Sequence, residues 1–261
     1  MRILITNDDG ISAPGLATLE AIAADIAGDG GEVWTVAPAF EQSAVSHCIS
    51  YVRPMLIQQL GERRFAVEGS PADCVLAGVH DVMKGEKPDL ILSGVNRGHN
   101  VAEDVIYSGT LSAAREATIH GIRSISMSQA YGAGNLGLPD MFEAARAHGP
   151  EIIRKLINNA PWFDQPYPVF YNINFPAIAA DEVKGVKTAV QGHRPAATFG
   201  VEPQTAPNGR FFLWLQHGSG NESAQPGTDA REIYEGYATV TPLRADSTAH
   251  ELVTSLSDLF T

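Results

Sequence analysis

The sequence is poor in cysteine and in long apolar runs. Its 261 residues include only two cysteines, Cys48 and Cys74, too few for the disulfide framework of a small secreted protein. No apolar run reaches the roughly 18 to 20 residues that a membrane-spanning helix needs. A strand is expected to begin within two residues of Met1, which leaves no room for a signal peptide. We therefore expect a soluble, cytoplasmic protein without a membrane partner.

Positive charge is also scarce, because 18 Lys and Arg stand against 30 Asp and Glu, for a net charge of −12. A long polyanion would be repelled by such a chain, so we expect no nucleic-acid polymer as partner. A small phosphorylated ligand stays compatible with this charge, since a bound cation can supply positive charge locally. The first predicted strand is not followed by Gly-x-Gly-x-x-Gly, which argues against a dinucleotide-binding oxidoreductase.

Runs typical of buried strands alternate with segments of helical periodicity, in a chain that is 44% hydrophobic. This alternation predicts an α/β fold, a doubly wound and mostly parallel sheet in a three-layer α/β/α arrangement. Residues 50–57 and 63–68 fit either an antiparallel excursion or a further pair of strands. The helix expected at 139–159 should be interrupted near Gly149 and Pro150. The main strands are expected at 2–7, 32–37, 89–95, 124–128 and 169–175, and the helices at 14–27, 70–83, 108–120 and 139–159.

The pattern becomes irregular after about residue 180. Gly, Pro, Asn and Gln punctuate residues 191–230, and only short strands are indicated, at 210–215 and 236–241, before a last helix at 246–257. This part is too irregular for a separate core. We expect a single domain over residues 1–261, with its core at about 1–180 and an appended β-rich oligomerisation arm at about 181–261.

Three polar clusters each follow a predicted buried strand. They are Asn7-Asp8-Asp9-Gly10, Glu41-Gln42-Ser43 and Asn96-Arg97-Gly98-His99-Asn100. In an open parallel sheet, ligands bind in the crevice beyond the carboxyl ends of the strands, where residues distant in sequence meet. The sequence therefore predicts an enzyme site assembled from these clusters.

Asp8 and Asp9 are the most informative residues of these clusters. Adjacent carboxylates repel one another unless a cation or a proton lies between them, and Gly10 allows the sharp turn that would bring both to one ion. A single Asp here would more often cap a helix or make an Asx turn. With Ser43 and Asn96, the pair forms an all-oxygen ligand set that suits Mg²⁺, Mn²⁺ or Ca²⁺ rather than structural zinc.

Tyr107-Ser108-Gly109-Thr110 is expected to open a helix just after the third cluster. Free backbone N–H groups and the helix dipole make such an end a site for phosphate, although Ser-Gly-Thr is also ordinary capping chemistry. We expect Asn100, Ser108, Gly109 and Thr110 to hold phosphate oxygens and stabilise transition-state charge. His99 is a candidate acid or ligand contact.

These segments resemble the SurE (survival protein E) family of metal-dependent nucleotidases, over nearly the full chain. The resemblance is carried by Arg2–Ile11 with Ala13-Pro14-Gly15, Val36-Ala37-Pro38 with Gln42-Ser43, Gly69–Val75, Ser93–Asn100, Tyr107–Thr110, Asn172–Pro176, Gly227-Thr228-Asp229, and Gly236-Tyr237 with Thr241-Pro242-Leu243. Two departures occur beside the site: Ala39-Phe40 replaces the usual Asp-Arg, and Ala44 replaces Gly. Neither removes a proposed ligand, and both alter the loop that would influence substrate preference.

The resemblance implies that Asp8, Asp9, Ser43 and Asn96 ligate one divalent cation per subunit. It also implies a Rossmann-like core, a carboxy-terminal arm exchanged between subunits, and a homodimer or tetramer. Family members look like phosphatases of nucleoside 5′- and 3′-monophosphates, some of which also trim polyphosphate.

Our mechanistic hypothesis is metal-assisted hydrolysis of a phosphomonoester, in which Asp8 or Asp9 also orients or deprotonates the attacking water. A phosphatase with an aspartyl-phosphate intermediate is a rival, but it typically carries Asp-x-Asp rather than adjacent acids. The rival from another class is a metal-dependent nucleotide-sensing or receiver-like module without turnover. Receivers are much shorter than this chain and need a phosphoacceptor Asp after their third strand.

Overall fold

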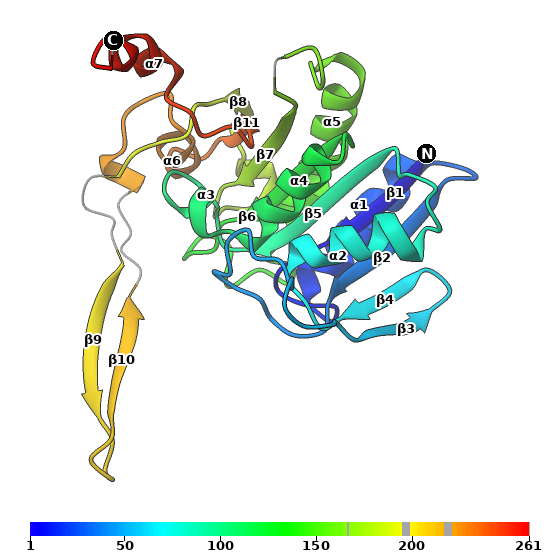
Figure 1. Cartoon of the computed structure of the whole chain (residues 1–261), viewed down its shortest axis with the longest axis horizontal. Helices are drawn as coiled ribbons and strands as arrows, with labels where there is room; N and C mark the ends of the chain where they lie inside the picture. The colour runs from blue at the N-terminus through cyan, green and yellow to red at the C-terminus, as the bar shows by residue number, and fades with distance from the viewer. Residues whose placement is uncertain (166, 195–198, 217–220, 261) are drawn as a thin grey trace.

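The computed structural model describes residues 1–165, 167–194, 199–216 and 221–260. A nine-stranded sheet in the order β3-β4-β2-β1-β5-β6-β7-β11-β8 forms its centre, as Figure 1 shows. The strands are β1 Arg2–Thr6, β2 Glu32–Pro38, β3 Ile57–Gly61, β4 Arg64–Val67, β5 Leu90–Arg97, β6 Ser124–Gln129, β7 Val169–Phe175, β8 Val186–Thr188, β9 Gly200–Thr205, β10 Phe211–Gln216 and β11 Ala238–Arg244.

The six strands from β4 to β7 in this order are parallel, while β3 and β11 run antiparallel to their neighbours β4 and β7. The predicted mostly parallel sheet is therefore confirmed. The helices are α1 Pro14–Ala27, α2 Pro71–Ala77, α3 Asp104–Tyr107, α4 Gly109–Ile119, α5 Glu143–Asn159, α6 Asp229–Tyr234 and α7 His250–Ser257, with a π-helical turn at Gly78–Val82 and 3-10 turns at Ala180–Glu182 and Asn221–Ser223.

The two faces of the sheet are covered by different helices. On β1, Ile3 and Ile5 belong to the core cluster built with α1 and α5, whereas Leu4 belongs to the cluster built with α2 and α4. This alternation is the two-residue period of a strand that is buried on both faces. The fold is thus the predicted three-layer α/β/α arrangement.

Two expectations about boundaries were wrong. The helix at 139–159 is not interrupted: α5 continues through Pro150, although this residue lacks the N–H of a regular helical bond. Close packing holds the segment, since a side chain on Gly149 would come within 2.9 Å of Met127 Cε. The sheet also extends past residue 180, because β11 pairs with β7 and β8 pairs with β11.

Within the C-terminal third, the β9–β10 hairpin projects away from the main sheet. It pairs antiparallel from Gly200↔Gln216 to Thr205↔Phe211, in a two-stranded sheet of its own. Figure 1 shows it projecting from the α/β layers, in yellow. No helix in the described ranges has the length and apolar character required to cross a membrane.

Candidate metal and phosphate site

Asp8 lies just beyond β1, where the sharp turn at Gly10 (φ +99°) carries the chain away from the sheet. Its carboxylate accepts hydrogen bonds from the backbone N–H of Thr110 at 3.0 Å and from the Thr110 hydroxyl at 2.6 Å. Gly109 makes this approach possible, because a Cβ there would lie 2.9 Å from the Asp8 Cβ. The start of α4 therefore fixes the orientation of Asp8.

The two adjacent acids are held by different neighbours. Burial raises the pKa of Asp8 to about 6, aided by the charge of Asp9 and opposed by the hydrogen bonds from Thr110. Burial also raises the pKa of Asp9, whose Oδ2 accepts the N–H of Arg97 at 3.1 Å. Both shifts show that the negative charges lack sufficient compensation from the protein, which is the electrostatic condition a cation would relieve.

Ser43 reaches the site from the loop that follows β2. Its hydroxyl donates to Glu41 Oε1 at 2.8 Å. Three residues further on, the Ser46 backbone N–H donates to the Tyr107 carbonyl at 2.9 Å, and the Ser46 hydroxyl donates to the Ile106 carbonyl at 2.8 Å. These bonds fasten the loop to the end of α3.

Asn96 lies near the end of β5, next to an irregularity in the strand pairing. Ser93 pairs with Ser126 and Asn96 with Ser128, so three steps along β5 match two along β6, as in a β-bulge. The Asn96 amide nitrogen donates to the Gly98 carbonyl at 2.9 Å. That bond occupies the amide nitrogen and leaves the carbonyl oxygen of the side chain to act as an acceptor or ligand.

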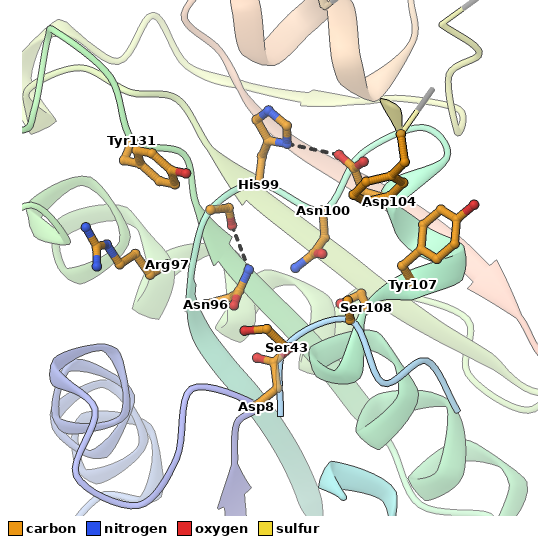
Figure 2. Close-up of a pocket in the computed structure, with 13 residues that line it drawn as sticks. Asp8, Ser43, Asn96, Arg97, His99, Asn100, Asp104, Tyr107, Ser108 and Tyr131 are labelled. Atoms are coloured by element: carbon orange, nitrogen blue, oxygen red, sulfur yellow. Dashed lines mark hydrogen bonds and ion pairs between the residues drawn. The ribbon is translucent and has the colours of Figure 1, made fainter. Parts of the chain in front are cut away.

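Three of the four predicted ligands share one cavity of about 360 Å³. Figure 2 shows Asp8, Ser43 and Asn96 together on one side of it. Asp9 lines an adjoining cavity of about 750 Å³, which also includes Ser43. Asp8, Ser43 and Asn96 thus face one cavity and Asp9 faces the adjoining one, with Ser43 lining both.

The donor set fits a hard divalent cation. Two carboxylates, a hydroxyl and an amide carbonyl are all oxygen ligands, which Mg²⁺, Mn²⁺ and Ca²⁺ prefer. Over the described ranges, the chain has no group of three or more His, Cys, Asp or Glu able to hold a metal ion. A cation at this site would therefore need the Ser43 and Asn96 oxygens in addition to the two carboxylates.

Asn100 is held in place on every side. Its backbone N–H donates to Asn174 Oδ1 at 2.8 Å, and its carbonyl accepts from the side-chain amides of Asn172 and Asn174. The side-chain nitrogen donates to Ser128 Oγ at 2.8 Å. Asn100 lines the same cavity as Asp8, so its amide is a preorganised group beside the predicted cation.

The residues at the start of α4 have two different roles. Ser108 lines the cavity, and its hydroxyl caps α4 by accepting the Leu111 N–H at 3.1 Å. Gly109 and Thr110 do not line the cavity, and both polar donors of Thr110 are directed to Asp8. The structure thus brings Asn100 and Ser108 to the cavity and places Thr110 behind Asp8.

Sequence reasoning missed several residues of the cavity wall. Among them are Asp104, Tyr131 and Phe199, whereas Arg97 and Tyr107 were named within the candidate clusters without a role, and His99 was named as a candidate acid or ligand contact. Asp104 accepts a hydrogen bond at 2.6 Å from Arg194, whose side chain is fully buried. Arg97 and Tyr107 adjoin predicted site residues, which was an available signal, whereas Tyr131 and Phe199 lie in irregular segments with no such mark.

The fold and the site define an α/β protein with an oxygen-lined candidate site beside the start of a helix. The chain belongs to the SurE family: the family model described as "Survival protein SurE" matches residues 3–198. This finding confirms the resemblance drawn from the motifs.

Curated relatives and a solved structure agree with this assignment. The chain is 57% identical over 256 residues to "5′-nucleotidase SurE" of Ruegeria pomeroyi, with 98% of each chain covered. It is 58% identical over 260 residues to the protein of the same name from a Jannaschia species, with 99% of each covered. The crystal structure of the SurE protein from Aquifex aeolicus matches with a TM-score of 0.83 at 34% identity, over 100% of both chains.

Proposed function

We propose that this chain is a divalent-metal-dependent phosphomonoesterase that hydrolyses nucleoside 5′- and 3′-monophosphates to nucleoside and phosphate. The observation that carries the proposal is the shared cavity, which Asp8, Ser43 and Asn96 line together with Asn100 and Ser108. Cation ligands and phosphate-holding groups are thus directed at the same space. The curated relatives named 5′-nucleotidase support the substrate class.

In this proposal Asp8, Asp9, Ser43 and Asn96 hold one cation per subunit. When bound, a divalent cation supplies Lewis-acid polarisation of a phosphoryl oxygen. Asp9 is the more accessible of the two acids and orients or deprotonates the attacking water, while Asp8 is fixed by Thr110. Asn100 and Ser108, which line the cavity, hold the phosphate oxygens through the displacement.

We also propose that the β9–β10 hairpin joins two copies of the chain. Residues paired across an antiparallel ladder share a face, so Val201, Pro203, Leu213 and Leu215 form one apolar face with Phe211. All of the residues in both strands are exposed. A lone two-stranded hairpin is at best marginally stable in water, and a second copy of the chain would cover this face.

One panel tests the activity. Phosphate release is measured from AMP, GMP, CMP, a nucleoside 3′-monophosphate and polyphosphate, each with Mg²⁺, Mn²⁺, Ca²⁺ or EDTA. We expect release from the monophosphates with at least one cation and none with EDTA, while polyphosphate reports whether the activity extends to it. Full turnover in EDTA would refute the metal role, and metal-dependent nucleotide binding without any turnover would favour a sensing module.

A further inference from the structure

The cavity that Asp9 faces is much larger than hydrolysis requires. Its volume is about 750 Å³, whereas a water molecule occupies about 30 Å³ in the liquid. The predicted phosphate contacts Asn100 and Ser108 do not line this cavity, and they belong to the adjoining one of about 360 Å³. The nucleophile that Asp9 orients therefore has far more space than one water molecule needs.

The two cavities extend to different sides of Asn96. Figure 2 shows Arg97 to one side of Asn96 and Asn100 to the other. Arg97 also lines the larger cavity with Asp9, whereas Asn100 and Ser108 line only the smaller one. A phosphate held by Asn100 and Ser108 would thus be open to attack from the side of Asp9.

The carboxylates of the larger cavity suit a neutral alcohol with several hydroxyl groups, a polyol. Asp9, Glu41 and Asp140 line the cavity, and each can accept hydrogen bonds from hydroxyls. Glu41 and Asp140 already accept bonds from Ser43 and Arg146, but a carboxylate oxygen has room for a further donor. The same three negative charges would repel an anionic ligand.

The donors and the apolar surface of this cavity come from other residues. The Arg97 guanidinium lies over the Tyr131 ring, 5.7 Å from its centroid, and both residues line the cavity. Pro139, Met141 and Phe142 add carbon surface. Together with the carboxylates, these residues offer a polyol donors, acceptors and apolar contact.

We propose that the enzyme also transfers the phosphoryl group of its substrate to a neutral polyol bound in the cavity beside Asp9. The inference rests on the proposed function and goes beyond it, because the polyol replaces water as the nucleophile. A polyol oxygen forms a bond to phosphorus, and the ester bond from phosphorus to the nucleoside oxygen breaks. The hydroxyl proton passes by way of Asp9 or solvent to the nucleoside oxygen. The products are the nucleoside and a polyol phosphate, so atoms and charge are conserved.

The test measures how the phosphoryl group of AMP is divided between water and an added alcohol. Phosphate and phosphate esters are quantified by phosphorus NMR, with a cation that supports hydrolysis and with equal concentrations of glycerol, methanol or glycerate. We expect at least about 10-fold more ester from glycerol than from either of the other two. Methanol lacks the additional hydroxyl groups, and glycerate brings a negative charge to a cavity with three carboxylates.

Ala13→Phe tests where the polyol binds. Ala13 is half-buried at the start of α1 and lines only the larger cavity, so a phenyl ring there would occupy space needed by glycerol. We expect the ratio of glycerol phosphate to phosphate to fall about 10-fold, and the ratio of methyl phosphate to phosphate to stay the same. Ala17→Phe is the matched control, because Ala17 is exposed one turn further along α1 and lines neither cavity. It should keep both ratios.

The comparison of the three alcohols needs only the wild type. Phosphate release without any polyol phosphate, or glycerol phosphate formed no more readily than methyl phosphate, would overturn the polyol site and leave hydrolysis standing. Efficient transfer to glycerate, or a glycerol ratio that Ala13→Phe does not change, would also overturn it. A wild type that releases no phosphate from AMP with any cation would instead refute the proposed function itself.

Discussion

The strand-end site and the β9–β10 hairpin differ in how their side chains are held. At the site, Asn100 is bonded through both backbone groups and its side chain, and Asp8 is 4% exposed. On the hairpin, Leu215 is 71% exposed, and among the described residues β9 and β10 pair only with each other. One chain supplies all the oxygen ligands of the proposed site, whereas the hairpin presents an apolar face that the described residues of one chain leave exposed.

The largest effect is expected from charges on the apolar face of the hairpin. In a symmetric dimer, the double substitution Leu213→Asp and Leu215→Asp removes four buried leucines, at about 2 kcal/mol each and roughly 8 kcal/mol in all. We expect the dimer to dissociate, as measured by light scattering after gel filtration. Gln216→Asp adds one negative charge per chain on the other face and should leave the dimer intact. A monomeric wild type would contradict the arm's role.

Asp9→Asn tests whether the site depends on its second acid. Loss of this charge weakens the cation site and removes the group that orients or deprotonates water, so we expect phosphate release from AMP to fall about 1000-fold, or roughly 4 kcal/mol. The urea unfolding midpoint should stay the same or rise, since Asp9 is an incompletely compensated charge. Asp29→Asn, in the exposed turn before β2, is the control. Wild-type turnover in Asp9→Asn would refute the assigned role.

The site residues near the strand ends could be predicted because they follow from the local sequence pattern. Continuous apolar runs defined β1, β2 and β5, and the polar residues beyond β1 and β2 and near the end of β5 include Asp8, Ser43 and Asn96. The cytoplasmic location, the oligomeric state and the ligand roles of these residues stay predictions. The family assignment and the fold class, in contrast, are confirmed.

What the sequence did not reveal depends on contacts between distant segments. Thr110 was expected at the phosphate, but its donors reach Asp8, 102 residues away along the chain. A short strand was expected at 236–241, but only the pairing of β11 with β7, and of the three-residue β8 with β11, places these strands in the main sheet. Phe199 reaches the cavity from an irregular segment whose composition marks no site.

Asp229 connects the two regions and predicts a pH effect on stability. Its carboxylate accepts the N–H groups of Gly192, on the segment that leads to the hairpin, and of Ala102, which lies before α3. Burial raises the pKa of Asp229 from its usual 3.8 to about 6, against the effect of these bonds. The folded state thus binds the proton more tightly than the unfolded state, so stability falls as pH rises from about 4 to 6, by roughly 3 kcal/mol.

Urea unfolding of the wild type and of Asp229→Asn at pH 4, 5, 6 and 7 would measure this contribution. The difference between the two free energies of unfolding isolates Asp229 from the other titrating groups. We expect the wild type to lose about 3 kcal/mol relative to the variant between pH 4 and pH 7. A difference that is constant with pH would show that the Asp229 carboxyl ionises in the fold as readily as in the unfolded chain.

The smallest effect concerns the loop that brings Ser43 to the site. His47, four residues after Ser43, is hydrogen-bonded to the Glu116 carboxylate of α4 at 2.7 Å. His120, the residue that ends the same helix, is hydrogen-bonded to this carboxylate at 3.0 Å. Both histidines are partly exposed, so His47→Ala and His120→Ala should each cost about 1 kcal/mol of stability or less. Only His47→Ala releases the loop. We therefore expect the Mn²⁺ concentration that gives half-maximal activity to rise a few-fold in His47→Ala and to stay unchanged in His120→Ala. Equal activation curves would mean that the Ser46 bonds to α3 alone hold Ser43 in place.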